Sequence, residues 1–360
     1  MSIQSYYRRL KPTYNIPWSR RGQLLDRKIE RCPYCRSRGV VRRGRRQTKH
    51  ESIQLYLCKD CRKTFSPKIL KSKQYPLKVI LDAISFYNLG HSKADTRRLL
   101  KEKYGLTINP DTLTNWINEL SPLCRYSRFR DQAKKQYSPP QLLQTAILNH
   151  RQVYYFRLHQ AKLNYLLSQP EFRHPRYHGM IDYFDSITND YPHRLFQTDK
   201  RSSQTKINFD FNQAQIPRKE NHATRLAQLV LQAVIDNRMR HEALQQFMLV
   251  NDSVTVAMEV PIYLKPQDLI HFNQKLKFTI PLKLESTLTG HIDILQTRNG
   301  LIHILDFKPN ARKEKPYPQL MLYALALSRL TGLRLYDFKC AWFDENDYFE
   351  FFPLHLVHKR

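Results

Sequence analysis

Apolar residues between positions 76 and 120 recur at helical spacing. In PLKVILDAISFYNLG they fall three and four residues apart, which places them on one face of a helix. Gly90 ends this helix, Ser92 caps a second helix over 93–103, and Asn109 caps a third that starts with Pro110. Three short helices joined by tight turns predict a helix-turn-helix-like unit at 76–120.

The last 140 residues show helix and strand patterns in the order α-β-β-β-α-β-β. The predicted elements are a helix, three strands, a second helix and two more strands, at 221–249, 253–264, 284–296, 302–308, 318–330, 335–343 and 348–352. This order predicts a mixed sheet flanked by helices, in a domain over 218–356.

Residues 121–217 carry a weaker pattern. The segment HRQVYYFRLHQAKLNYLL predicts an amphipathic connecting helix, and the polar stretch 189–217 predicts a domain boundary. We interpret 121–217 as a helical and irregular linker, and residues 1–27 as a basic arm.

Four of the six cysteines form two close pairs, Cys32 with Cys35 and Cys58 with Cys61, and 22 residues separate the pairs. Two such turns present four thiolates to one tetrahedral Zn²⁺. A segment this short has little core, so the metal would stabilise its fold. The sequence predicts a structural zinc ribbon at 28–70, with no open position for catalysis on the ion. With the helix-turn-helix-like unit and the mixed sheet, this ribbon makes the chain an expected α/β multidomain protein.

The positive charge is unevenly distributed. Residues 1–140 hold 32 lysines and arginines against 10 acidic residues, and residues 141–360 hold 28 against 21. This asymmetry favours a polyanion bound mainly by the N-terminal part, and we expect DNA. A solvated basic surface or a membrane-surface patch is the alternative. The apolar runs are too short for a membrane span and the N-terminus has no apolar core of a secretory signal, so the expected location is the cytoplasm and no membrane partner is expected.

The segment TGHIDILQTRNGLIHILDFKPN carries the candidate chemistry. Asp306 and Lys308 lie two apart on a strand and so face the same side, and a tight hairpin at 298–300 would bring Asp293 beside them. Two carboxylates suit Mg²⁺ or Mn²⁺, and a lysine beside them can orient or deprotonate water. A structural Asp–Lys salt bridge is the alternative, but charged groups in buried strands are costly without partners.

These residues resemble the PD-(D/E)XK nuclease superfamily, in particular its RecB-like branch. The matching motifs are GHID, DFK and QLMLY, in that order. The resemblance implies a DNA-hydrolysing enzyme with Asp293, Asp306 and the Phe307 carbonyl as metal ligands and Lys308 as the catalytic lysine. Gln319 and Tyr323, on one helical face, would support the site or contact DNA. His222 is where that branch often adds a metal ligand, and Glu259 is a candidate supporting residue or simply a half-buried glutamate.

Two further points come from resemblance. Some RecB-like nucleases hold an iron–sulfur cluster on four cysteines, but only Cys124 and Cys340 remain here, so no cluster is expected. The cysteine segment and the following helices are similar to the zinc ribbon and helix-turn-helix of insertion-sequence transposases, although no DDE catalytic domain follows. The implied DNA-contacting residues are those of the basic turn and of the third helix: Arg42, Arg43, Arg45, Arg46, Thr112, Thr114 and Asn115.

The leading hypothesis is thus a metal-dependent deoxyribonuclease, targeted by a zinc ribbon and helix-turn-helix and of mobile-element, defence or repair origin. The alternative is a sequence-specific DNA-binding regulator, or a transposition accessory protein, with a non-catalytic nuclease-like fold.

Overall fold

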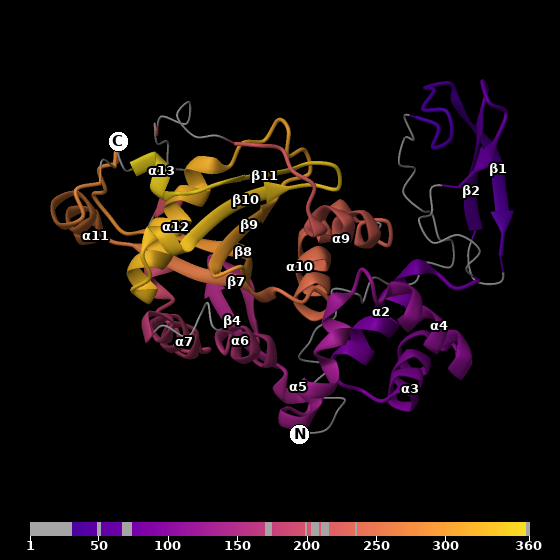
Figure 1. Cartoon of the computed structure of the whole chain (residues 1–360), viewed down its shortest axis with the longest axis horizontal. Coiled ribbons are helices and arrows are strands. Elements are labelled where there is room, and N and C mark those ends of the chain that lie inside the picture. Colours follow the sequence, from indigo (N-terminus) through magenta and orange to yellow (C-terminus); the bar gives the residue numbers. More distant parts are fainter. Residues whose placement is uncertain are drawn as a thin grey trace. The chain divides into compact units, whose positions relative to one another are not determined.

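The computed structural model describes residues 31–48, 52–66, 74–169, 175–198, 200–202, 209, 216–234, 236–278 and 280–357 (Figure 1). The basic arm expected at 1–27 lies outside these residues. The chain divides into two compact units. The first comprises Met1–Tyr87, His91–Leu120 and Gln228–Leu244, and the second comprises Asn88–Gly90, Ser121–Ala227 and Gln245–Arg360.

A small antiparallel sheet opens the described part of the first unit. Its strands follow one another in the order β1 (Val40–Gln47), β2 (Ser52–Cys58) and β3 (Thr64–Phe65). Strand β1 is bulged between Arg42 and Gly44, and Gly44 adopts a left-handed φ of 102°. Every residue of β1 after Val40 is exposed, so its arginines face solvent.

Three helices follow, as the apolar spacing predicts: α2 (Leu77–Asn88), α3 (Lys93–Tyr104) and α4 (Pro110–Leu120). The Ser92 hydroxyl accepts a hydrogen bond from the Asp95 amide and caps α3, and Gly105 ends it at a φ of 68°. The Asn109 carboxamide accepts from the Asp111 amide at 2.8 Å. The three predicted helices are confirmed, with bounds within a residue or two.

The second unit is built on a mixed sheet. Its described strands run in the order β11-β10-β9-β8-β7-β5-β4, and the short strand β6 pairs with β8. The bounds are β4 (Leu143–His150), β5 (Gln152–His159), β6 (Lys200–Arg201), β7 (Thr255–Leu264), β8 (Leu288–Arg298), β9 (Leu301–Phe307), β10 (Phe338–Phe343) and β11 (Tyr348–Phe351). Strands β9 and β10 are parallel, as are β6 and β8, and the other neighbours are antiparallel.

Helix α12 (Tyr317–Thr331) runs along the strands β7–β10 in Figure 1 and is buried along most of its length. The shorter helices of the second unit are α5 (Arg130–Gln136), α6 (Gln160–Leu167), α7 (His178–Asp185), α8 (Arg194–Thr198), α11 (Pro266–Ile270) and α13 (Leu354–Val357). No helix among the described residues has the length and apolar character that a membrane span requires. The predicted fold class, an α/β chain with a cysteine-bearing sheet, a helical part and a mixed sheet flanked by helices, is confirmed.

Two sequence predictions need correction. Residues 121–217 are not only a helical linker, because β4 and β5 pair along their whole length and join the main sheet through β7. The segment predicted as one connecting helix is β5 followed by α6, and the buried His159 accepts from the Lys162 amide at the junction. Val153 and the three aromatic residues that follow it favour a strand.

The helix predicted at 221–249 is two helices, α9 (His222–Val230) and α10 (Arg240–Asn251). Between them, the Asp236 carboxylate accepts from the Arg238 amide and begins a 3-10 turn over Asn237–Met239. An acidic side chain that bonds its own following backbone competes with continuous helix, which explains the interruption.

Strands β8 and β9 are joined by the two-residue turn Asn299–Gly300, with left-handed φ values of 51° and 69°. Asn-Gly suits such a turn because both residues tolerate positive φ. The turn sets a register in which Ile294 pairs with Leu305, and the next residues along, Asp293 and Asp306, therefore lie opposite each other.

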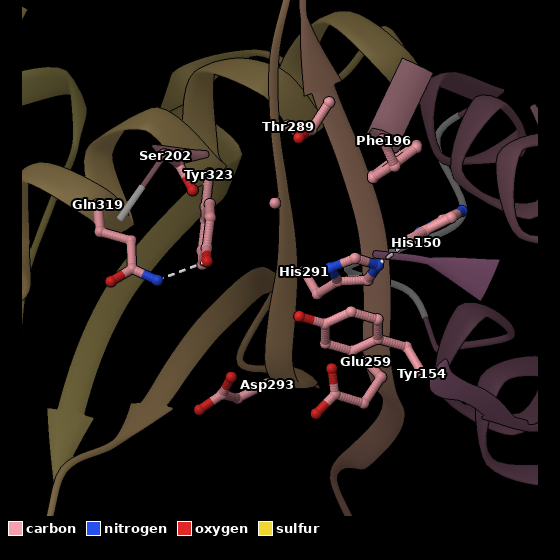
Figure 2. Close-up of a pocket in the computed structure, with 11 residues that line it drawn as sticks. His150, Tyr154, Phe196, Ser202, Glu259, Thr289, His291, Asp293, Gln319 and Tyr323 are labelled. Atoms are coloured by element: carbon pink, nitrogen blue, oxygen red, sulfur yellow. Dashed lines mark hydrogen bonds between the residues drawn. The ribbon is translucent and has the colours of Figure 1, made fainter. Parts of the chain in front are cut away.

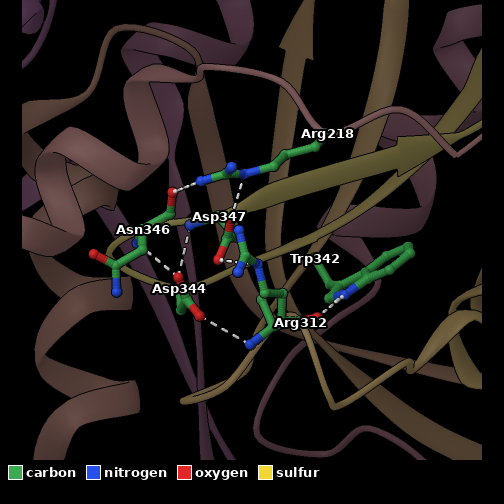
Figure 3. Close-up of polar contacts among 7 residues, drawn as sticks. Arg218, Arg312, Trp342, Asp344, Asn346 and Asp347 are labelled. Atoms are coloured by element: carbon green, nitrogen blue, oxygen red, sulfur yellow. Dashed lines mark hydrogen bonds and ion pairs between the residues drawn. The ribbon is translucent and has the colours of Figure 1, made fainter.

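Polar contacts hold the β10–β11 turn against the chain that follows β9 (Figure 3). The Asp344 carboxylate accepts from the amides of Asn346 and Asp347 within the turn and from the Ala311 amide at 2.9 Å. Arg218 and Arg312 both form ion pairs with Asp347. Because the Lys308 amide also donates to the Phe343 carbonyl at 2.9 Å, the backbone on both sides of residue 308 is fixed.

Candidate active site and cysteine cluster

The four paired cysteines converge. The Sγ atoms of Cys32 and Cys61 are 3.6 Å apart, those of Cys35 and Cys58 are 3.5 Å apart, and all four lie within 4.8 Å of one another. Arg36 and Arg62, which follow the two pairs, have φ values of 60° and 53°. Each pair therefore lies on a tight turn that ends in a left-handed residue.

Backbone donors surround this cluster. The Tyr34 amide donates to the Cys32 sulfur at 3.4 Å. The amides of Cys61 and Asp60 lower the pKa of the Cys58 thiol to about 7, whereas burial and the neighbouring Cys32 sulfur raise the pKa of Cys61. Thiolates are the form that binds metal, and four sulfurs so close fit one tetrahedral ion. The four-cysteine cluster has the composition and spacing of a structural zinc site.

In the second unit, Asp306 at the end of β9 is 2% exposed, and it lies opposite the half-buried Asp293 on β8. Burial, and then the negative charge of Asp293, raise the pKa of Asp306 well above its usual value. Two neighbouring carboxylates, one of them buried, repel each other unless a proton or a cation lies between them. The oxygen donors of the two carboxylates are of the kind that a hard divalent cation prefers.

Lys308 provides a positive charge beside the two carboxylates. Its Nζ lies 2.9 Å from Asp306 Oδ2, and the lysine side chain is 22% exposed. Burial alone would lower the pKa of Lys308, but the carboxylates of Asp306 and Asp293 outweigh it and the pKa is raised. The ammonium thus faces both the carboxylate pair and solvent.

Helix α12 brings two polar side chains to the same region. The Gln319 amide donates to the Tyr323 hydroxyl (Figure 2). Burial and the charge of Asp293 raise the pKa of Tyr323. Gly290 on β8 permits this approach, since a Cβ there would lie 2.6 Å from Tyr323 Cε1 and 2.7 Å from Ser202 Oγ.

A cavity of about 190 Å³ adjoins Asp293 (Figure 2). Its described lining residues come from β4, β5, α8, β7, β8 and α12 and from the residue after β6: His150, Tyr154, Phe196, Ser202, Glu259, Thr289, Gly290, His291, Asp293, Gln319 and Tyr323. Asp293 is therefore shared by the carboxylate pair and the cavity.

One side of the cavity is a stacked set of rings. Tyr154 stacks on His291 with centroids 3.7 Å apart, and Phe196 stacks on His150 at 3.8 Å. Nδ1 of His150 and Nε2 of His291 are 2.8 Å apart, so one ring donates to the other. Burial, and then the charge of His193, lower the pKa of His150 to about 4.

Glu259 has an unusual backbone for a strand residue. Its φ is 51°, and the register of β7 with β8 places it opposite Asp293. The Gln245 amide donates to Glu259 Oε1 at 2.8 Å. Left-handed backbone in a non-glycine residue is strained, and such strain tends to collect at functional sites. Glu259, Asp293 and Asp306 thus lie side by side on three adjacent strands.

The structure brings together Asp293, Asp306 and Lys308, with Gln319 and Tyr323 beside Asp293. It does not bring His222 to them. His222 on α9 has its Nε2 2.8 Å from the Leu123 carbonyl, and the charges acting on it are those of Asp252, Arg125 and Arg225. The Phe307 side chain is buried against Phe343.

The predicted DNA-contacting residues lie in the first unit. Arg42, Arg43, Arg45 and Arg46 are exposed on β1. On α4, Asn115 is exposed and Thr112 half-buried, whereas the Thr114 hydroxyl accepts from Lys93 Nζ at 3.0 Å and donates to the Pro110 carbonyl.

Sequence reasoning missed the cavity. His291 could have been found, because it lies two residues before Asp293 on the same strand and within the GHID motif. His150 and Tyr154 could not, because the strands that carry them fall in the segment predicted as a linker.

Comparison with known proteins agrees with this geometry. Residues 192–346 match the family model described as the PD-(D/E)XK nuclease superfamily. Neither a curated protein nor a solved structure matches the chain. The match covers β7–β10, α12 and the whole acid, acid and lysine set. Residues 192–346 therefore form a domain of the PD-(D/E)XK nuclease superfamily.

Proposed function

We propose that the chain is a Mg²⁺- or Mn²⁺-dependent deoxyribonuclease of the RecB-like kind that hydrolyses phosphodiester bonds. The observation that carries the proposal is the juxtaposition of Asp293 and Asp306 on paired strands, with Lys308 Nζ 2.9 Å from Asp306. The superfamily match over these residues supports it.

Asp293 and Asp306 would hold the divalent ion through carboxylate oxygens, and the Phe307 carbonyl is a further candidate ligand. When bound, such an ion lowers the pKa of its water and offsets charge at the scissile phosphate. Lys308 orients Asp306 and, being partly exposed, can donate to a phosphate oxygen or to water. Gln319 and Tyr323 support the site from α12 by the hydrogen bond that links them.

We assign DNA targeting to the first unit. The four cysteines would hold Zn²⁺ and keep the ribbon folded. Exposed arginines on β1 are suited to phosphate contacts, and Thr112, Thr114 and Asn115 on α4 are candidates for contacts in a groove. The organisation of ribbon and helices is consistent with a mobile-element ancestry.

Cleavage by the full-length protein tests the enzyme. Linear, circular and single-stranded DNA are incubated with Mg²⁺ or Mn²⁺. Wild type should cut at least one form, Asp306→Ala and Asp293→Ala should cut none, and Lys308→Ala should be slower by about 100-fold or more. Lys313→Ala, a change at an exposed lysine five residues further on, should cut like wild type.

Failure of wild type to cut any form, or full activity in Asp306→Ala, would remove the nuclease proposal. A protein that still binds DNA under those conditions would then be a DNA-binding regulator with a nuclease-like fold. DNA binding that survives all three active-site changes is expected in either case, because the arginines and helices of the first unit lie elsewhere in the chain.

A further inference from the structure

We propose that the cavity beside Asp293 binds one unpaired nucleotide of the substrate, next to the scissile phosphate. The inference rests on the proposed nuclease function and adds the class of nucleic acid that the site accepts. Its residues from β4 and β5 lie outside the stretch that matches the nuclease superfamily.

The lining suits the uncharged part of a nucleotide. Among the described residues that line the cavity there is no lysine or arginine. Hydroxyl and amide groups are present on Ser202, Thr289 and Gln319, and carboxylates on Glu259 and Asp293. A phosphate would meet no lysine or arginine there, whereas a base and a sugar carry N–H, O–H and acceptor groups that these side chains can pair with.

Aromatic rings form the opposite part of the lining. Tyr154 and His291 are half-buried and stacked at 3.7 Å, and the fully buried pair of His150 and Phe196 backs them. The contact between His150 Nδ1 and His291 Nε2 fixes the orientation of the imidazole in the outer pair. Fixed aromatic side chains are the usual partners of unpaired bases.

Position links the cavity to the chemistry. Asp293 lines the cavity and also lies opposite Asp306, whose carboxylate contacts Lys308. A nucleotide whose phosphate lies at the carboxylate pair has its base and sugar directly beside this cavity. Glu259 and Asp293, opposite each other on β7 and β8, mark the boundary between the two regions.

The size of the cavity favours an unpaired base. The cavity holds about 190 Å³ and has walls from strands, a helix and stacked rings. A base within a duplex is stacked and paired, and it enters such a space only after being unstacked. The site therefore favours single-stranded ends, flaps and frayed termini over intact duplex.

The test uses the full-length protein with Ca²⁺ in place of Mg²⁺, so that binding is measured under conditions of slow turnover. Oligonucleotides carry 2-aminopurine at an unpaired terminal position or at the same position within a duplex, as DNA in one arm and as RNA in another. Stacking should quench the fluorescence of the unpaired probe and not that of the duplex probe. Quenching of either the DNA or the RNA probe supports a nucleotide site. The probe that is quenched more strongly shows whether the site prefers deoxyribose or ribose.

Substitutions test whether the quenching of 2-aminopurine fluorescence comes from binding in the cavity. Tyr154→Ala should weaken binding of the unpaired probe about tenfold, as expected for the loss of one stacking partner. Tyr154→Phe should retain it, and Tyr336→Ala, a change at a 63% exposed tyrosine outside the cavity, should match wild type. Cleavage in Mg²⁺ should show the same order on single-stranded DNA.

The two proposals fail separately. If wild type cuts DNA but prefers intact duplex, or if the unpaired probe is not quenched, the cavity proposal is overturned and the nuclease proposal stands. If nothing is cut but quenching occurs and depends on Tyr154, the unpaired-nucleotide site stands and the nuclease proposal does not.

Discussion

Asp306 occupies an environment that is unfavourable for a charged group in the metal-free protein. It is almost fully buried, it lies opposite Asp293, and both effects raise its pKa. A residue kept at such a cost to stability is more readily explained by chemistry than by folding. The folding cost of this carboxylate can therefore be measured independently of cleavage.

We predict that Asp306→Asn is at least as stable as wild type in EDTA. A raised pKa in the folded state means that the contribution of Asp306 to stability is complete below its unfolded pKa and is lost as pH rises through the folded value. Because asparagine does not ionise, the free energy of unfolding of the variant should rise relative to that of wild type as pH rises, by about 1 kcal/mol or more. Urea unfolding at pH 5 and pH 8 measures this difference.

Mn²⁺ should raise the unfolding midpoint of wild type and leave that of Asp306→Asn unchanged, because a ligand of the native state stabilises it. Asp337→Asn is the matched control. That buried carboxylate accepts from the Arg334 amide at 3.0 Å, at the start of the 3-10 turn Leu335–Asp337, so its loss should destabilise at both pH values. An Asp306→Asn protein that is less stable than wild type at both pH values would argue for a structural role.

For single residues, the sequence predicts those positions that depend only on the local geometry of a strand or a turn. Asp306 and Lys308 are two apart on a strand, and the Asn-Gly turn brings Asp293 opposite Asp306, so alternation and one turn rule were enough. The position of His222 depends on which side chains and carbonyls surround α9, and no local rule predicts its contact with Leu123.

Among the secondary-structure elements, strong periodicity was a sound guide and mixed periodicity was not. The predicted bounds of α3, α4, β9 and α12 agree with the structure within one or two residues. Besides the interrupted helix at 221–249, a prediction failed at β5 and α6, where a strand passes directly into a helix at His159. The helix begins at the residue directly after the strand, with no loop between them, so the two have the pattern of one amphipathic segment and only pairing with β4 separates them.

The cysteine-bearing sheet should depend on its metal. Its core cluster is small, with Cys32, Tyr56, Cys58 and Phe65 as its buried members, and two of these belong to the four-cysteine cluster. Cys58→Ser should lose the zinc, which metal analysis of the full-length protein should otherwise find at about one per chain, and the ribbon should unfold.

Cys340→Ser is the control for that change. This thiol is buried in β10 and lies 3.4 Å from the Leu320 carbonyl, far in sequence from the four-cysteine cluster. The control should keep its zinc even if the second unit loses stability. Zinc retained in Cys58→Ser, or a folded ribbon that contains none, would contradict the structural-zinc assignment.

For the whole molecule, the structure shows where part of the excess positive charge of the N-terminal part lies. The exposed strand β1 carries four of the arginines that make the N-terminal part basic. An extended row of exposed guanidinium groups is suited to the phosphate backbone, which attracts charge without regard to sequence. The role of this strand in binding is therefore expected to be visible in the salt dependence.

In the full-length protein, Arg45→Gln with Arg46→Gln should lower the slope of log affinity against log salt by about 2, since each phosphate contact contributes roughly 0.9. The matched control replaces Lys134 and Lys135, which are exposed on α5 in the second unit, by glutamine. Equal effects of the two double variants on DNA binding would show that only total charge matters.

The rings beside Asp293 have a consequence for how this protein can be divided. His150 and Tyr154 lie upstream of the superfamily match, whereas Asp293, Asp306 and Lys308 lie inside it. Under the two proposals above, part of the substrate preference therefore depends on β4 and β5, outside the stretch that carries the three residues assigned to hydrolysis. Insertions or exchanges within β4 and β5 could change the preferred nucleic acid while the hydrolytic residues stay as they are, which gives selection, or an engineer, two separate parts to alter.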